Sequence, residues 1–257
     1  MRKMVINVGN TNVAIGILDT DGKLKTYSLT HKYEHTGRHI DELIVSQVQS
    51  SKIEIDSIVI SSVVPALSDY LSSALKRAMG IKPYTIDKKD ITLDYTTYDS
   101  SLLGIDRLLV CQSALNKYKP PFIVFDMGTA ITANVIDKDG KFVGGAIMPG
   151  IEMGLQALNV GTALLPSVDI MKESDFVIGN NTNKCLISGA IYGTASMVDG
   201  ITKKIENELG YTCNVIMTGG GAKYIAPQCQ IQVNHEHELL LYGLLSIELK
   251  KEVGNDN

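Results

Sequence analysis

The feature that most constrains this chain is an internal duplication. The stretch VINVGNTNVAIGIL at residues 5–18 has the pattern of an apolar strand, a polar turn and a second apolar strand, and the same order returns at residues 123–137 as IVFDMGTAITANVID. Matching positions are Asn7 and Asp126, Gly9 and Gly128, Thr11 and Thr129, and the turns Asp21-Gly22-Lys23 and Asp139-Gly140-Lys141. Apart from the extra residue Asn10, the halves stay in register across both turns, which two unrelated strand pairs would not be expected to do. The chain is therefore predicted to form two similar domains, residues 1–117 and 118–257.

The hydrophobic pattern predicts three antiparallel strands at the start of each half, followed by helices and a further strand. In the first half we expect strands within 5–18 and at 23–29, joined through Asp19-Thr20-Asp21-Gly22, a helix at 39–49, a strand at 57–64 and a helix at 66–79. In the second half we expect strands near 122–126, 130–137, 141–148 and 214–218, and helices near 151–160, 186–208 and 239–251. Each half resembles a ribonuclease H-like unit, an α/β fold with a mixed five-stranded sheet flanked by helices. Two such units would leave a cleft between them, with both strand-turn-strand loops pointing into it.

Length, net charge and cysteine spacing limit the classes of protein to which this chain can belong. The chain has 257 residues, enough for two domains with sizeable cores. Its net charge of −4 gives no general attraction to nucleic acid. The four cysteines are widely scattered, which favours reduced structural thiols in a cytoplasmic protein. The N-terminus does not have the pattern of a signal peptide, and no apolar run approaches the ~20 residues that cross a bilayer.

The two repeated turns are candidate phosphate-binding loops. A turn of the form D/N-x-G with a nearby threonine offers backbone N–H groups and a hydroxyl to a phosphate, and its glycine lets the ligand come close. A hairpin in which the glycine only supplies a positive φ would explain one copy. Two copies in register favour the phosphate hypothesis.

The run Thr218-Gly219-Gly220-Gly221 follows a predicted strand and precedes Ala222. A strand-to-helix turn would need one glycine, whereas three can bring bare backbone against a nucleotide. Together with the repeated turns, Gly219 and Gly220 therefore predict a nucleotide site.

The segment Leu102-Leu103-Gly104-Ile105-Asp106-Arg107 is predicted to begin a helix. Asp106 has two interpretations: an acid placed favourably at a helix N-terminus, or the group that takes a hydroxyl proton during phosphoryl transfer to an alcohol. His235 and His237 are interpreted as part of an exposed, charged start to the final helix, because no third metal ligand is evident.

In combination these residues resemble the type III pantothenate kinases, which belong to the superfamily of acetate and sugar kinases, 70-kilodalton heat-shock chaperones and actin. The motifs that carry the resemblance are V-G-N-T at 8–11, S-S-V-V-P at 61–65, G-x-D-R at 104–107, D-x-G-T-A at 126–130, G-G-x-I-x-P-G at 144–150, T-A-x-L-P at 162–166, G-x-N-T at 179–182 and T-G-G at 218–220. They span nearly the whole chain in order.

The resemblance implies ATP-dependent phosphorylation of pantothenate, the first committed step towards coenzyme A, with Mg²⁺ and a monovalent cation, K⁺ or NH₄⁺. It implies that ATP is contacted by Thr129 and by Asn7, Val8, Gly9, Asn10, Thr11, Asn12, Val13 and Ala14. It implies that pantothenate is held by Gly104, Ile105, Asp106, Arg107, Thr182 and Tyr98, with Asp106 as the proton acceptor. Asp126 would bind the monovalent cation. A homodimer that builds the pantothenate pocket across its interface is implied too.

The chain departs from the family pattern in two places. Asn7 stands where the family has Asp, so an uncharged amide replaces a group that can hold hydrated Mg²⁺. Tyr98 lies six residues before Gly104 with no proline between them, where the family has a seven-residue spacing and a proline. Two alternatives follow: a catalytically weak paralogue that binds ligand or regulates, suggested by Asn7, and a kinase for another small alcohol, suggested by the altered loop at 98–103.

Overall fold

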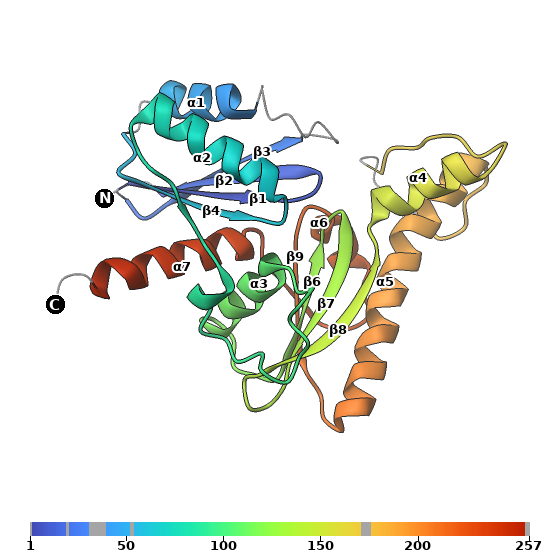
Figure 1. The fold of residues 1–257 in the computed structure, drawn as a ribbon. Coiled ribbons are helices and arrows are strands. Elements are labelled where there is room, and N and C mark those ends of the chain that lie inside the picture. Colours follow the sequence, from blue (N-terminus) through green and yellow to red (C-terminus); the bar gives the residue numbers. More distant parts are fainter. Residues whose placement is uncertain (1, 19–20, 31–39, 52–53, 171–175, 255–257) are drawn as a thin grey trace. The chain divides into compact units, whose positions relative to one another are not determined.

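The computed structural model describes residues 2–18, 21–30, 40–51, 54–170 and 176–254 (Figure 1). The chain forms two compact units, and we describe each by itself. Unit 1 comprises residues 1–92, 101–113 and 239–257, and unit 2 comprises residues 93–100 and 114–238. The sequence repeat predicts a single boundary at residue 117, whereas unit 1 also takes in residues 239–257 and unit 2 takes in residues 93–100.

Unit 1 is built on a mixed five-stranded sheet in the order β3-β2-β1-β4-β5. Its strands are β1 (Lys3–Val8), β2 (Asn12–Leu18), β3 (Leu24–Thr30), β4 (Ser57–Ser62) and β5 (Tyr84–Thr85). β1 runs antiparallel to β2 and β2 to β3, while β4 runs parallel to β1 and β5 parallel to β4. The short helix η1 (Lys88–Asp90) follows β5.

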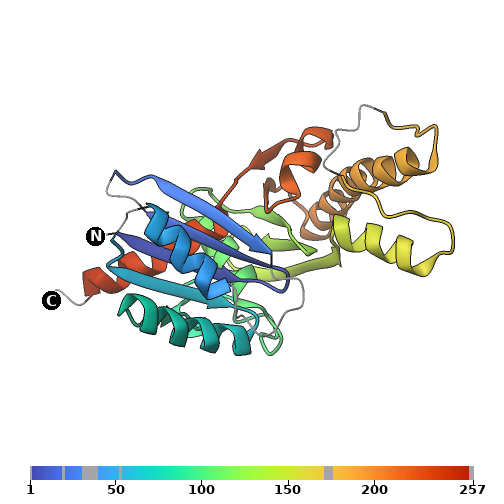
Figure 2. The same cartoon turned by 90° about the horizontal axis from the view of Figure 1, so that it is seen from above.

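Helices cover both faces of this sheet. α1 (Ile40–Ser51) and α2 (Pro65–Met79) lie side by side over one face, and α7 (Leu239–Gly254) lies against β1 and β4 on the other (Figures 1 and 2). Alternation along the strands explains this division, because successive side chains point to opposite faces. Met4, Ile6 and Val8 join the core cluster that includes residues of α1 and α2. Val5 and Gly16 lie beside Leu241 of α7.

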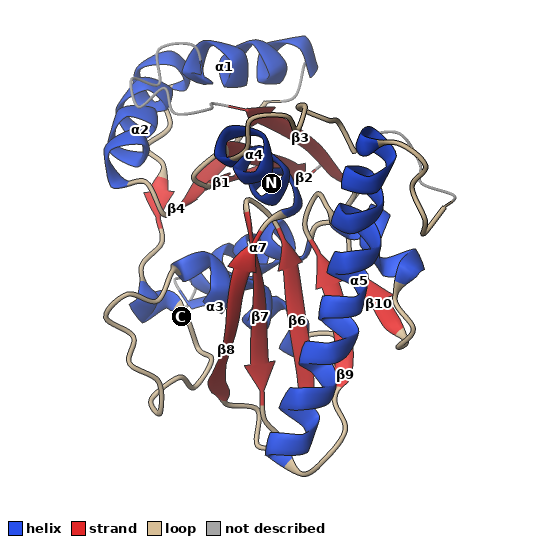
Figure 3. Ribbon diagram, turned by 90° about the vertical axis from the view of Figure 1, so that its right-hand side faces the viewer, coloured by secondary structure: helices blue, strands red, loops and turns tan. Residues whose placement is uncertain are grey.

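Unit 2 repeats this plan with a sheet in the order β10-β9-β6-β7-β8 (Figure 3). Its strands are β6 (Phe122–Met127), β7 (Ala130–Ile136), β8 (Phe142–Pro149), β9 (Asn214–Thr218) and β10 (Val233–His235). Again the first three strands are antiparallel, and β9 is parallel to β6. The two mixed five-stranded sheets predicted from the repeat are thus confirmed.

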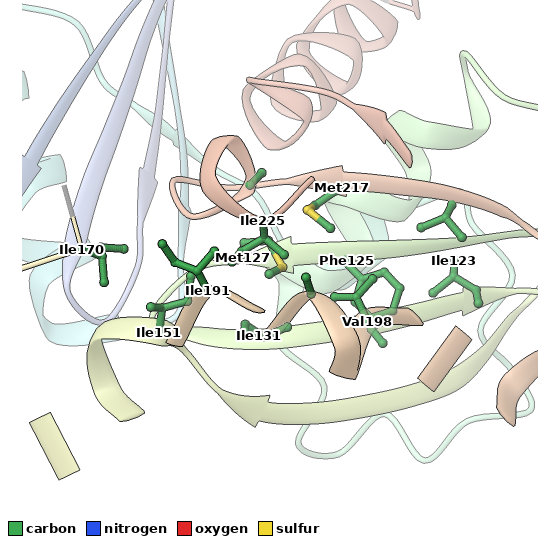
Figure 4. Close-up of a cluster of buried hydrophobic side chains, with 14 of the residues drawn as sticks. Ile123, Phe125, Met127, Ile131, Ile151, Ile170, Ile191, Val198, Met217 and Ile225 are labelled. Carbon is green, nitrogen blue, oxygen red and sulfur yellow. The ribbon is translucent and has the colours of Figure 1, made fainter. Parts of the chain in front are cut away.

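The helices of unit 2 are α4 (Ile151–Gly161), α5 (Thr182–Leu209), α6 (Ala222–Ile225) and the short η2 (Ala226–Gln228). The long α5 runs along one face of the sheet (Figure 3). Alternate residues of β6, including Ile123, Phe125 and Met127, pack with Ile191 and Val198 of α5 in one buried cluster (Figure 4).

Most expected elements are present, with shifted ends. α5 begins at Thr182 rather than near residue 186, because the Asn181 side chain accepts a hydrogen bond from the Lys184 N–H at 3.0 Å and caps the helix. α3 (Ile105–Leu115) begins three residues later than expected from Leu102. The turn residues Asp19 and Thr20 and the helix start at His39 lie outside the described residues. Among the helices that the structure describes, none is long and apolar enough to span a membrane.

Candidate active site

The first repeated turn forms the tip of the β1–β2 hairpin in unit 1. The Gly9 N–H donates to the Asn12 carbonyl oxygen at 3.0 Å, and the Thr30 hydroxyl donates to Asn12 Oδ1 at 2.8 Å. Val8 and Val13 face each other across the hairpin and are fully buried. The resemblance implies that residues 7–14 contact ATP. In the structure these residues together form one hairpin tip. The two valines themselves are covered on all sides, so their role is to hold the hairpin in place.

The second repeated turn lies beside the glycine run in unit 2. Asp126, the penultimate residue of β6, lies opposite Thr218 of β9, and Gly219 follows Thr218 directly. The space that a Cβ at position 219 would take lies 2.5 Å from Asp126 Oδ1. The Gly221 N–H donates to the Met127 carbonyl oxygen at 3.0 Å. The structure thus brings together Asp126 and the glycine run that the sequence predicted separately.

The three glycines of the run have different environments. Gly219 has a φ of +87° and lies against Asp126, and Gly221 lies against Met127, so packing explains both. Gly220 has open space where its side chain would be, with no atom within 4 Å. Packing therefore does not require glycine at position 220.

Replacing Gly219 by Ala is expected to destabilise unit 2 and to abolish nucleotide binding. A Cβ there would collide with Asp126 and with the Met127 backbone, and the left-handed φ adds strain of about 1 to 3 kcal/mol. Thermal unfolding should show a lowered Tm, and titration with nucleotide should show no binding. Gly220→Ala is the matched control: its Tm should match that of the natural chain, and a lowered Tm would contradict this account.

Asp106 is the second residue of α3 and lies in unit 1. Its Oδ1 accepts the Arg107 N–H at 2.9 Å, and a Cβ at position 104 would clash with its carboxylate. The G-x-D spacing therefore has a packing reason, because glycine leaves room for the acid to fold back over the start of the helix. The Arg107 side chain is 9 % exposed.

Burial raises the pKa of the Asp106 carboxyl above its ordinary value of 3.8. The Arg107 N–H and the Arg107 charge act against this shift, and burial outweighs both. A carboxylate with a raised pKa is a better proton acceptor than an exposed one. Asp106 is thus suited to accept a proton from an alcohol.

Tyr98 and Thr182, the other predicted pantothenate contacts, both lie in unit 2. The Tyr98 ring stands edge-on to Phe142, with the centroids 5.2 Å apart at an interplanar angle of 81°. It also lies beside Gly144 of β8, where an added Cβ would be 3.6 Å from the ring. Thr182 is the first residue of α5. The predicted pantothenate contacts are thus divided between the two units, with residues 104–107 in unit 1 and Tyr98 and Thr182 in unit 2.

A cavity of about 380 Å³ between α4 and α5 was not predicted from the sequence. Thr182 lines it together with mainly apolar residues, among them Leu155, Leu158 and Leu186. Cys185 lies on its wall and is an exposed free thiol. The cavity arises where two helices far apart in sequence meet, a contact that local patterns do not encode.

The prediction for the two histidines is wrong. His235 ends the short strand β10, and α7 begins only at Leu239, so neither histidine belongs to a helix. Between them, Glu236 is partly buried, accepts a hydrogen bond from the Tyr118 hydroxyl and pairs with Lys117 at 2.5 Å. Within the described ranges, no group of three or more His, Cys, Asp or Glu side chains is arranged to hold a metal.

Solved structures with the same architecture define the class of fold. A Baf family transcriptional activator from Campylobacter jejuni matches with a TM-score of 0.61 at 19% identity, covering 97% of this chain and 99% of that chain. The activator of 2-hydroxyisocaproyl-CoA dehydratase from Clostridium difficile, solved with bound ADPNP, matches with a TM-score of 0.57 at 13% identity, covering 100% and 98%. The chain thus has the two-domain fold of the actin-like ATPases and sugar kinases.

The family follows from sequence comparison. The family model for type III pantothenate kinase matches residues 3–204. Type III pantothenate kinases from Persephonella marina and Desulforapulum autotrophicum are 34% and 33% identical, covering 94% of this chain in both cases and 96% and 94% of those proteins. The chain belongs to the type III pantothenate kinase family, as the ordered motifs predicted.

Proposed function

We propose that this protein transfers the γ-phosphoryl group of ATP to pantothenate, giving 4'-phosphopantothenate in the first step of coenzyme A biosynthesis. The observation that carries the proposal is the placement of Asp106 at the start of α3, folded over Gly104 in the G-x-D-R motif of the family. The sequence favours a cytoplasmic enzyme without nucleic-acid partners.

In this mechanism, Asp106 accepts the proton of the pantothenate hydroxyl while that oxygen attacks the γ-phosphorus. Arg107 anchors the substrate, and Ile105, buried at the first position of α3, fixes the start of the helix. Tyr98 and Thr182 complete the pantothenate contacts. Because phosphoryl transfer asks little covalent chemistry of the protein, the main task of these residues is to position the alcohol.

ATP would be held by the hairpin tip at residues 7–14 and by Thr129, Gly219 and Gly220. The carboxylate oxygens of Asp126 fit a hard cation, which binds oxygen ligands, whereas the neutral amide oxygen of Asn7 fits a water ligand of such an ion. Mg²⁺ neutralises phosphate charge when bound, and Asp126 would hold the monovalent cation, K⁺ or NH₄⁺. The missing side chain of Gly219 leaves the space that the Asp126 carboxylate needs for this role.

A coupled assay of ADP release with ATP, Mg²⁺, K⁺ and pantothenate tests this function. We expect turnover that needs pantothenate and that produces one phosphopantothenate for each ADP. Release of ADP at the same rate without pantothenate would identify an ATPase. Turnover with another small alcohol but not with pantothenate would contradict the proposed substrate.

The proposal includes a homodimer formed through the surface of α4 and the segment that follows it. Apolar side chains are exposed there, including Val160 at 77 % and Leu164 at 90 %. Replacing both by Asp is expected to change the mass measured by light scattering from that of a dimer to 27.9 kDa. If the pantothenate pocket crosses the interface, loss of the dimer should also lower turnover at least about tenfold.

Leu43→Asp serves as the control for this dimer test, because Leu43 is also an exposed leucine but lies on α1 of unit 1. This variant should remain dimeric. A dimer mass that persists in the Val160→Asp, Leu164→Asp double variant would place the interface elsewhere.

A further inference from the structure

Asn7 has a partner position that the sequence motifs did not reveal. In the parallel pairing of β1 with β4, Asn7 lies directly opposite Ser61. Residues paired in this way present their side chains on the same face of the sheet. Ser61 is fully buried. Asn7 Oδ1 and Ser61 Oγ are both buried atoms, and neither has a hydrogen-bond partner among the residues that the structure describes.

The same arrangement recurs in unit 2. There Asp126 on β6 lies opposite Thr218 on β9, so each unit places a hydroxyl residue against the first residue of its repeated turn. In unit 2 the residue is an acid, and the Thr218 hydroxyl donates to the His237 carbonyl oxygen at 3.5 Å. In unit 1 the amide is neutral and the hydroxyl of Ser61 is unused. Both units thus have a hydroxyl residue at this position, but the residue opposite it is an amide in unit 1 and an acid in unit 2.

Two unpaired oxygens in one buried spot indicate a missing hydrogen-bond partner. Leaving a buried polar group unsatisfied costs about 1 to 3 kcal/mol, so native proteins nearly always pair such groups with protein, water or ligand. The Asn7 oxygen can only accept, whereas the Ser61 hydroxyl can donate and accept. Two neutral oxygens of this kind suit a water molecule better than a bare cation.

The position of Asn7 and Ser61 in the sheet indicates what kind of water molecule they would hold. Asn7 and Ser61 lie at the carboxyl ends of two parallel strands, where ligands bind in open α/β sheets. The Val63 N–H donates to the Val8 carbonyl oxygen at 3.0 Å and joins the two strand ends just before the turn at Gly9. The pair therefore adjoins the hairpin tip that is the proposed phosphate loop. Magnesium bound with nucleotide keeps several of its water ligands.

We propose that Ser61 is a nucleotide-site residue: its hydroxyl and the Asn7 amide oxygen together hold a water ligand of the Mg²⁺ that accompanies ATP. This inference rests on the proposed kinase function. It explains how an uncharged residue can serve at position 7, because the hydroxyl supplies a second hydrogen bond to the hydrated ion. Ser61 acts through the water and is a positioning residue.

Binding of the non-hydrolysable analogue AMPPNP, measured by calorimetry with Mg²⁺ and again with EDTA, tests the inference. Ser61→Ala should weaken binding about fivefold with Mg²⁺, the loss expected for one hydrogen bond, and leave binding in EDTA unchanged. Ser61→Thr keeps the hydroxyl, as unit 2 does at Thr218, and should stay within about twofold of the natural chain with Mg²⁺.

Ser57→Ala is the matched control. Ser57 lies at the opposite end of β4, on the same face, and its Oγ is also buried without a partner in the described part of the chain. Ser57→Ala should leave the affinity for AMPPNP unchanged both with Mg²⁺ and with EDTA. An equal effect of Ser57→Ala and Ser61→Ala would overturn the inference, because the effect would then follow from burial alone.

The other outcomes are equally decisive. A loss in Ser61→Ala of the same size with Mg²⁺ and with EDTA would assign the hydroxyl a structural role and overturn the inference. If Ser61→Ala left AMPPNP binding unchanged with Mg²⁺ and with EDTA, the hydroxyl would hold only a structural water. This result would also overturn the inference. In those cases normal ADP release by the same preparation would leave the kinase function standing. A natural chain that binds no nucleotide would overturn both.

Discussion

Replacing Asp106 by Asn is expected to lower kcat for pantothenate phosphorylation by about 10²- to 10⁴-fold, the range for loss of a general base. The amide is nearly the same size and can still occupy the space over Gly104, so the site should keep its shape. It cannot take the hydroxyl proton. The KM for ATP should change little, because the predicted ATP contacts do not include Asp106. Steady-state kinetics with each substrate varied in turn provides the measurement.

The pH dependence of the natural chain gives a second measurement of the same role. Burial raises the Asp106 pKa above 3.8, and only the ionised form accepts a proton. The value of kcat/KM should therefore fall as the pH drops through this raised pKa, at a higher pH than for an exposed Asp. The residual activity of Asp106→Asn should lack this step. A step that persists in the variant would assign it to another group.

Stability should change in the opposite direction to activity. A raised folded-state pKa means that the native state favours the protonated acid. The corresponding stability is present below the unfolded-state pKa and is lost as the pH rises through the folded-state value. At pH 7 the ionised Asp106 is therefore a cost, and Asp106→Asn should have a higher Tm than the natural chain. The difference should shrink towards pH 4.

Asp41→Asn is the control for the alternative interpretation of Asp106. Asp41 is the second residue of α1, as Asp106 is of α3, so both are acids in the first turn of a helix. If the charge of Asp106 only complements the helix N-terminus, both variants should affect stability alone. Equal kcat values for the two variants would contradict the catalytic role.

The fold was largely predictable because the same hydrophobic pattern occurs twice in the sequence. The alternation of apolar residues at 5–18 and 123–137 places the same three strands in both halves, and the structure has them. β5 and β10 were missed because strands of two or three residues are too short to show a period. The strand ending at His235 was interpreted as a helix start, because its polar residues are next to the apolar run of α7.

Candidate site residues could be singled out from the sequence where one loop carries them and not where strands meet. The G-x-D-R segment at 104–107 and the glycine run at 219–221 stand out as local patterns, whereas the space that Gly104 leaves for the Asp106 carboxylate is known only from the structure. Ser61 was not singled out by itself, because its relation to Asn7 exists only in the register of β1 and β4. The cavity between α4 and α5 was missed for the same physical reason.

Replacing Asn7 by Asp is expected to raise kcat/KM for MgATP about tenfold or more, corresponding to about 1.4 kcal/mol of transition-state stabilisation for each factor of ten. A carboxylate near the end of β1 can hold hydrated Mg²⁺ by its charge. The same charge is costly without the metal, because the position 7 oxygen is buried. The variant should therefore have a lower Tm than the natural chain without ligand and a larger rise in Tm with Mg²⁺ and AMPPNP.

Asn214→Asp adds the same charge at the exposed start of β9 and should leave kcat/KM within about twofold, since surface charge has little effect at a distance. A kcat/KM for Asn7→Asp that is unchanged or lower would mean that the site is adapted to the amide and that charge at position 7 does not limit the rate. The gain should also depend on Ser61 if the two side chains share one water. In the Ser61→Ala background, Asn7→Asp should give a different gain than in the natural chain, because contacting residues couple whereas independent ones add.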